Sequence, residues 1–152
     1  MRGLKFLTLL TFLLAIPVRA QGVRPEQMFE RGKSSLESGD TVSAVKRLKI
    51  ASFGLLNDPE QYASALVYLS VALGRSGDAA GAAKAIEKLV EVERVEPVLA
   101  SLEIPPMIYA DFSKLASSAT MTPAKFTAIA RLLKNREVTK QSEAQLGSGD
   151  RP

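Results

Sequence analysis

The side chains that could do chemistry in this sequence are carboxylates, hydroxyls and amines, because the chain contains neither cysteine nor histidine. This composition excludes disulfide frameworks, thiolate or imidazole metal sites, haem attachment and catalysis by a histidine base or cysteine nucleophile. Three glutamates at 91, 93 and 96 could attract a cation, but their spacing is not that of a calcium loop. Ser34 beside Lys33 is a pair that any charged helix can contain. We therefore expect no enzyme activity, no cofactor and no bound metal.

One pair of residues allows an enzymatic interpretation. Glu37-Ser38 resembles the acid-bearing Glu-Ser pair of helical lytic transglycosylases, in which a glutamic acid of raised pKa protonates a glycosidic oxygen. The resemblance implies a carboxylate-dependent peptidoglycan hydrolase. No downstream Gly-Leu-Met-Gln-like stretch accompanies the pair, and a repeated turn explains Gly39-Asp40, which follows it. The hydrolase is therefore kept as an alternative.

The first twenty residues, 1–20, have the pattern of a secretory signal peptide. Arg2 and Lys5 precede an apolar run over 6–16, and Val18 and Ala20 place small residues three and one before a cleavage site. The run of roughly 11 residues is about half of the ~20 needed to span a bilayer. We expect cleavage after Ala20, a periplasmic or secreted protein, and no stable membrane insertion after cleavage; an uncleaved anchor is the alternative.

Most of the net positive charge lies in this leader. The whole chain has 20 basic and 16 acidic residues. Three of the basic residues are Arg2, Lys5 and Arg19, so 17 basic residues remain against the same 16 acidic ones. No cluster of Lys and Arg interleaved with aromatic residues remains either. We therefore expect no nucleic-acid partner.

The remaining chain has the apolar spacing of helices and no strand pattern. With 46% hydrophobic and 24% charged residues it has the composition of a single globular domain, which we assign to 21–135. Caps, prolines and turn residues predict helices over 25–38, 42–53, 59–76, 79–94, 106–117 and 123–134. Few aliphatic residues follow, so 136–152 is expected to be a disordered tail.

The fourth of these helices has alternating charges. Lys84, Glu87, Lys88 and Glu91 are spaced three or four residues apart, which predicts ion pairs along a solvated face. Ile86 and its apolar neighbours on the opposite face are expected to point inward.

The turns repeat with a period of 38 residues. Gly39-Asp40 recurs as Gly77-Asp78, Ala44 as Ala82, Leu48 as Ile86, and Asp58-Pro59 as Glu96-Pro97. This arrangement resembles the tetratricopeptide repeat (TPR) family, whose helix-turn-helix units pack through small residues. The positions that carry the resemblance are Met28, Gly32, Gly39, Ala44, Leu48 and Ala51 in the first unit and Leu66, Leu69, Ser70, Leu73, Gly77, Ala82, Ile86 and Leu89 in the second. Arg31 and Leu89 depart from the family pattern, and the family period is 34 residues.

The resemblance covers 25 to about 97 and implies an all-α fold of about two TPR-like units. A solenoid needs about three units to bury a continuous face, so the helices at 106–117 and 123–134 are expected to cap the stack. Without the phased turns, the same periodicity would predict only a helical bundle.

In that family the first helix of each unit lines a concave groove that binds peptides. The corresponding partner groove would consist of Glu26, Phe29, Lys33, Leu36, Glu37, Ser64, Val67, Val71 and Arg75. The resemblance implies a protein-protein interaction module or scaffold of the bacterial cell envelope, with an unidentified protein or peptide partner. Two alternatives remain: Phe29, Val67 and Val71 pack into the core, or the protein is an assembly subunit docked through its C-terminal helices. The family's carboxylate clamp is not reproduced, since the only asparagines are Asn57 and Asn135.

Overall fold

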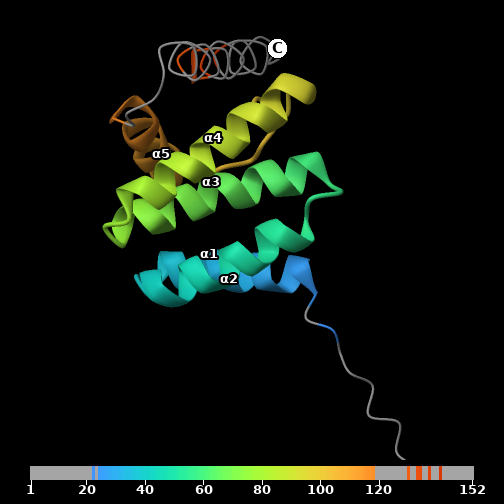
Figure 1. Ribbon diagram of the computed structural model, residues 1–152. Coiled ribbons are helices and arrows are strands. Elements are labelled where there is room, and N and C mark those ends of the chain that lie inside the picture. Colours follow the sequence, from blue (N-terminus) through green and yellow to red (C-terminus); the bar gives the residue numbers. More distant parts are fainter. Residues whose placement is uncertain are drawn as a thin grey trace, which may run out of the picture.

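The computed structural model describes residues 22 and 24–118, together with the single positions 130, 133, 134, 137 and 141. Over 24–118 the chain forms helices and no strand (Figure 1), which confirms the all-α class. The helices are α1 (Pro25–Glu37), α2 (Thr41–Gly54), α3 (Pro59–Arg75), α4 (Ala79–Val95) and α5 (Pro106–Ser118). All five were predicted, with ends that differ by no more than one residue. None of these described helices is long and apolar enough to cross a membrane.

Three predicted segments lie wholly or largely outside the described residues. They are the signal peptide at 1–20, the helix at 123–134 and the tail at 136–152. The described positions Ala130, Leu133 and Lys134 are helical, as are Glu137 and Gln141 within the predicted tail.

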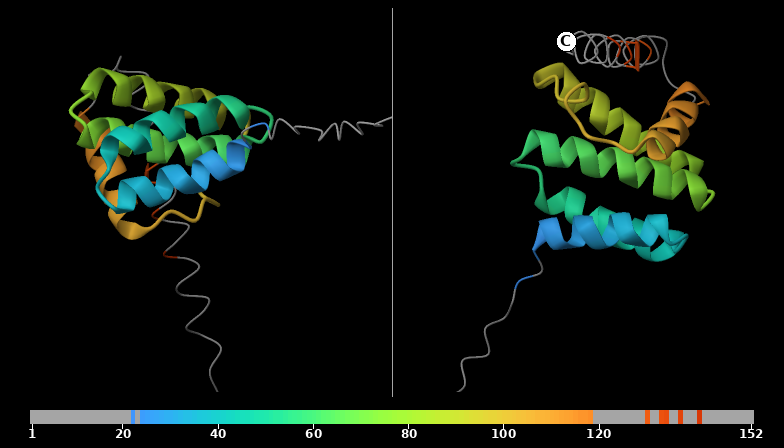
Figure 2. Two further views of the ribbon diagram at one scale, coloured as in Figure 1. Left: turned by 90° about the horizontal axis from the view of Figure 1, so that it is seen from below. Right: turned by 180° about the vertical axis from the view of Figure 1, so that it is seen from behind.

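The helices pack as two hairpins and a covering helix. Helix α1 packs on α2, α3 packs on α4, and the two hairpins meet through α2 and α3. Helix α5 packs on α3 and, less extensively, on α4. Figures 1 and 2 show the two hairpins stacked with α5 against the second. Helix α3 is therefore the central element, since it contacts all four others.

Both hairpins turn through the same glycine-aspartate pair. Gly39 and Gly77 have φ angles of +84° and +86°, a backbone conformation that glycine adopts readily and other residues do not. Asp40 and Asp78 then cap α2 and α4, where their Oδ1 atoms accept from backbone N–H groups three residues on at 3.1 and 2.8 Å. The 38-residue sequence period thus corresponds to a repeated turn geometry.

Helix α3 begins with an aspartate cap and a proline. The Oδ1 atom of Asp58 accepts from the backbone N–H of Gln61 at 3.0 Å, and Pro59 is the first helical residue. The Gln61 side chain also donates to the Asp58 carboxylate, with 2.6 Å between Nε2 and Oδ2.

The sequence repeat does not start a third hairpin at Glu96-Pro97. Helix α4 ends there, and the chain runs without a helix until α5. Glu93, which is almost fully buried, accepts the backbone N–H of Val98 at 2.9 Å and also that of Leu99. This carboxylate holds the connection against the helices while four of its apolar residues, Val98, Leu99, Leu102 and Ile104, enter the core.

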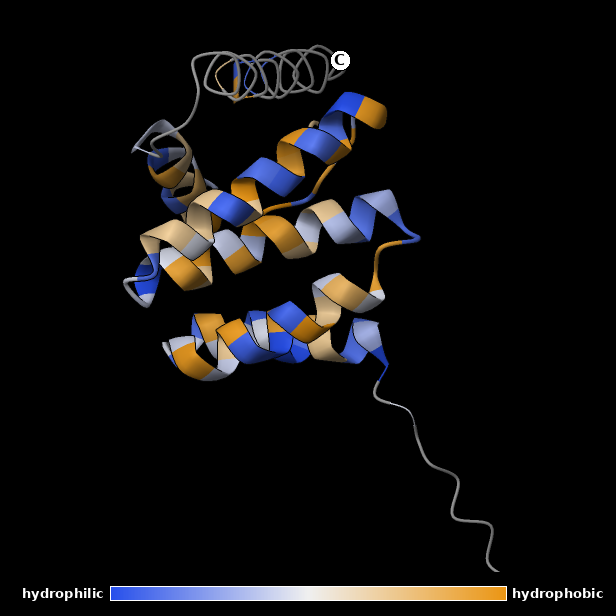
Figure 3. Cartoon of the chain, viewed as in Figure 1, coloured by the Kyte–Doolittle hydropathy of each residue, from blue (hydrophilic) through white to orange (hydrophobic). Residues whose placement is uncertain are grey.

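The core surrounds α3. Every residue over 65–73 is buried, as expected for a helix that is apolar on all sides and covered by its neighbours. Figure 3 shows this apolar stretch between helices whose outward faces are hydrophilic. Gly32 lies where α1 and α2 pack closely, since an added Cβ would lie 2.7 Å from Cγ of Leu48. The small residue expected at this position is therefore required by the packing.

Candidate functional site

The nine residues predicted to line a partner groove do not form one open surface. The four apolar members are buried: Leu36, Val67 and Val71 have no exposed surface, and Phe29 keeps 8%. The Phe29 ring meets the ring of Tyr68 edge-on, with centroids 5.6 Å apart. These four side chains therefore stabilise the core and present no binding surface.

The charged groove positions on α1 are engaged locally. The Lys33 ammonium lies 5.2 Å from the ring centroid of Phe29 and 5.7 Å from that of Tyr68, and it pairs with Glu30 at 3.2 Å. Burial raises the pKa of Tyr68, and the nearby charges of Glu37 and Glu30 raise it further.

The remaining predicted positions differ among themselves. Glu26 is exposed and lies 4.0 Å from Arg24, and Ser64 is half-buried on α3. Arg75 donates to Asp111 of α5, so its guanidinium holds two helices together and is not a free rim charge.

The residues of the hydrolase interpretation lie at the exposed end of α1. Glu37 is exposed at the last position of α1, and the Ser38 hydroxyl donates to the backbone carbonyl of Ser35 at 3.0 Å. Neither residue lines the hollow that is found between α2 and α4. Within the described residues, no group of three acidic side chains is placed to hold a metal ion.

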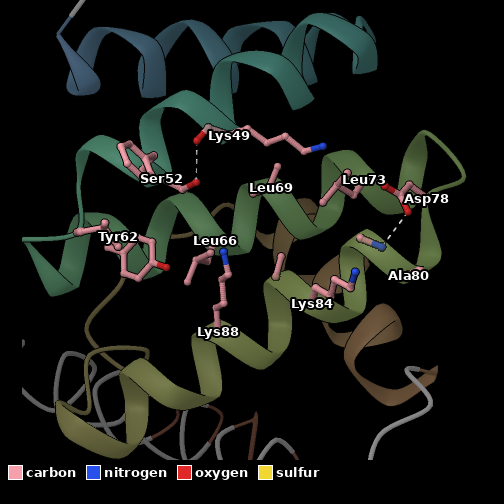
Figure 4. A pocket seen from close by; sticks show the side chains of 14 residues that line it. Lys49, Ser52, Tyr62, Leu66, Leu69, Leu73, Asp78, Ala80, Lys84 and Lys88 are labelled. Carbon is pink, nitrogen blue, oxygen red and sulfur yellow. Dashed lines mark hydrogen bonds between the residues drawn. The ribbon is translucent and has the colours of Figure 1, made fainter.

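A cleft lies between α2 and α4, over α3 (Figure 4). Both outer helices pack on α3, but no Cα atom of α2 lies within 8 Å of a Cα atom of α4. The resulting space has a volume of about 650 Å³. Its floor is a stripe of α3 side chains spaced by four, three and four residues: Tyr62, Leu66, Leu69 and Leu73. This spacing places all four on one face of the helix. We call this site the α2–α4 cleft.

Three lysines line the cleft from its two sides. Lys49 comes from α2, and Lys84 and Lys88 come from α4; Figure 4 shows them on opposite sides of the leucine stripe. All three are exposed, and within the described residues none of them forms an ion pair. The Asp78 carboxylate also lines the cleft but is engaged in capping α4.

The ion pairs predicted for α4 are therefore wrong. Glu91 pairs with Arg94 at 2.6 Å and not with Lys88. Lys84 and Lys88 stand one turn apart on the cleft wall instead.

Apolar side chains, together with Glu91 and Glu96, surround one end of the cleft. A second hollow of about 380 Å³ continues from the first and shares Leu56, Tyr62 and Lys88 with it. Phe53 in the first hollow is 80% exposed, and Val95 in the second is 83% exposed. Adjacent exposed apolar side chains at a hollow are typical of an interaction site. Burial raises the pKa of Tyr62, which lies between the two hollows.

The site thus lies mainly on the second helices of the hairpins and on one face of α3, whereas the prediction placed it on first helices. The sequence did contain a signal for it. Lys49 and Phe53 are one turn apart on α2, as Lys84 and Lys88 are on α4. Comparison of the chain with protein-family models, curated proteins and solved structures finds no match.

Proposed function

We propose that this protein is an exported helical interaction module of the bacterial cell envelope that binds a segment of another protein in the α2–α4 cleft. The observation that carries the proposal is the cleft itself: two helices flank α3 with their backbones apart, and the space between them combines exposed apolar side chains with lysines that form no ion pair among the described residues. A signal-peptide pattern at 1–20 supports export.

The energetics favour a protein partner. Burying an exposed Phe or Leu side chain contributes about 1.5–3 kcal/mol. Phe53 and Leu56 are both available for such burial at the cleft. Protein interfaces combine an aromatic anchor of this kind with charged residues at the rim, and the lysines here have that position.

The two hairpins also support a TPR-like arrangement within this proposal. Their turns share the Gly-Asp geometry, and the two hairpins pack on each other through α2 and α3. The binding surface differs from the one that the family resemblance implies, because the first-helix apolar positions are buried. The second helices would carry it instead.

Site-specific photo-crosslinking in living cells tests the proposal. A photoreactive phenylalanine analogue replaces Phe53 in the full-length exported protein. Met107 serves as the matched control, since it is a large apolar residue, 73% exposed, on α5 away from the cleft. We expect a discrete protein adduct from position 53 and none from position 107.

Two outcomes contradict the proposal. An adduct only from Met107 would move the interface to the C-terminal helices and favour a docked assembly subunit. Turnover of cell-wall polymer by the purified protein, abolished by Glu37→Gln, would establish the hydrolase instead.

A further inference from the structure

The charge distribution in the α2–α4 cleft indicates the chemistry of its occupant. Lys49, Lys84 and Lys88 place three ammonium groups around a leucine floor, and within the described residues none has a carboxylate partner. The one carboxylate that lines the same hollow, Asp78, is held by its own helix N-terminus. The hollow is therefore electropositive, and a carboxylate-bearing ligand would complement it.

The apolar end adds a second requirement. Leu56 is exposed where the lysine-lined hollow meets its neighbour, Phe53 is exposed within the lysine-lined hollow, and Val95 is exposed in the second hollow. Glu91 and Glu96 also line the second hollow, so the excess of positive charge is confined to the first. A ligand that filled both hollows would have to bring apolar surface to this end and negative charge to the other.

We infer that the cleft binds an acidic protein segment that carries an apolar anchor. Its carboxylates face Lys49, Lys84 and Lys88, and its anchor packs against Phe53 and Leu56. This inference rests on the proposed function and names the class of its partner.

The placement of the lysines favours such a segment over an anionic membrane. The three side chains come from two helices on opposite sides of α3 and converge on the hollow between them (Figure 4). A flat bilayer surface would contact basic residues on one outward face. A narrow polypeptide segment can enter the hollow and reach both walls.

Peptide binding to the purified protein tests the inference. The probes are three fluorescein-labelled peptides of equal length with identical Leu and Phe positions, whose intervening positions are all Glu, all Gln or all Lys. We expect the Glu peptide to bind about 10-fold more tightly than the Gln peptide, with the Lys peptide weakest. The preference should shrink as ionic strength rises from about 0.05 to about 0.5 M, because salt screens these charges.

Matched charge variants locate the effect. Lys49→Gln, Lys84→Gln and Lys88→Gln together should abolish the preference for the Glu peptide. The control combines Lys46→Gln, Lys114→Gln and Lys134→Gln, which removes the same charge from exposed positions outside the cleft. This control should keep the preference, and circular dichroism should show native helicity for both triple variants.

Several results would overturn the inference. They are equal affinity for the Glu and Gln peptides, no binding of any probe, an unchanged preference in the cleft variant, or an equal loss in the control. Binding to phosphatidylglycerol vesicles that the cleft variant alone loses, without a peptide preference, would assign the lysines to anionic lipid.

Crosslinking from position 53 separates this inference from the proposed function. An adduct that persists undiminished in the cleft variant would leave the interaction module intact and reject the acidic partner. Absence of any adduct from position 53 in the wild-type background would reject the module itself.

Discussion

Arg75 of α3 binds Asp111 of α5 through two atoms of its guanidinium group. Its Nε and Nη2 both donate to Oδ2 of Asp111, at 2.9 and 2.6 Å, while Nη1 lies 3.5 Å from the backbone carbonyl oxygen of Leu36 in α1. One side chain at the end of the central helix thus connects the first hairpin, the second hairpin and the covering helix. A residue that the sequence placed on a groove rim has a structural role.

A double-mutant cycle measures this connection. Arg75→Ala and Asp111→Ala should show a coupling free energy of about 0.2–1 kcal/mol in urea unfolding, because both side chains remain partly solvated and solvent screens the pair. The coupling should decrease at high salt. Strictly additive single effects at low salt would show that the contact contributes nothing to stability.

The two turn glycines should respond equally to substitution. Gly39→Ala and Gly77→Ala should each lower the free energy of unfolding by about 1–2 kcal/mol, since alanine disfavours positive φ. A Cβ at either position would meet no atom within 4 Å, so the cost comes from the backbone alone. Thermal unfolding of the two variants checks this, and a loss confined to one of them would contradict the equivalence of the turns.

Glutamate substitutions should separate the core from the cleft. Val67 has no exposed surface, so Val67→Glu would bury an unpaired carboxylate and should abolish the cooperative unfolding transition. Phe53→Glu should change stability by no more than about 0.5 kcal/mol, because the side chain is already in solvent. Thermal unfolding of both variants followed by circular dichroism tests these expectations. A wild-type melting transition for Val67→Glu would indicate that Val67 faces an open groove and not the core.

Alkaline pH should destabilise the protein partly through Tyr68. Burial, and secondarily Glu37 and Glu30, raise the pKa of this phenol above its usual value of 10.0. The folded state therefore holds the proton more tightly than the unfolded state, and the associated stability is present below the unfolded pKa and lost as pH rises through the folded pKa. Between about pH 9 and about pH 11, the melting temperature of Tyr68→Phe should fall less steeply than that of the wild type. Identical slopes would contradict this assignment.

Processing of the leader can be measured directly. If Val18 and Ala20 mark the cleavage site, the exported protein begins at Gln21 and lacks residues 1–20. Mass spectrometry of the protein recovered from the envelope fraction would show this terminus. An intact Met1 in the membrane fraction would instead indicate an uncleaved anchor.

The sequence alone determined the local structure. Pro25, Asp58 and the Gly-Asp pairs predicted where helices begin and end, because each acts on backbone groups only a few residues away. The TPR resemblance predicted Gly32 as a small close-packing position, and an added Cβ there would meet Leu48.

Which apolar residues face a partner and which face the core was decided by the tertiary structure. Helical spacing places Val67 and Val71 on one face of α3, but it does not say that every residue over 65–73 is buried in the fold. The cleft also depends on tertiary packing. Lys49 and Lys88 lie on helices that have no Cα atoms within 8 Å of each other, and only the packing of both helices on α3 brings the two residues to one hollow. The helical period of 3.6 residues determines which residues share a face of a helix. Which faces of different helices pack together depends on how the helices bury their apolar surface away from water.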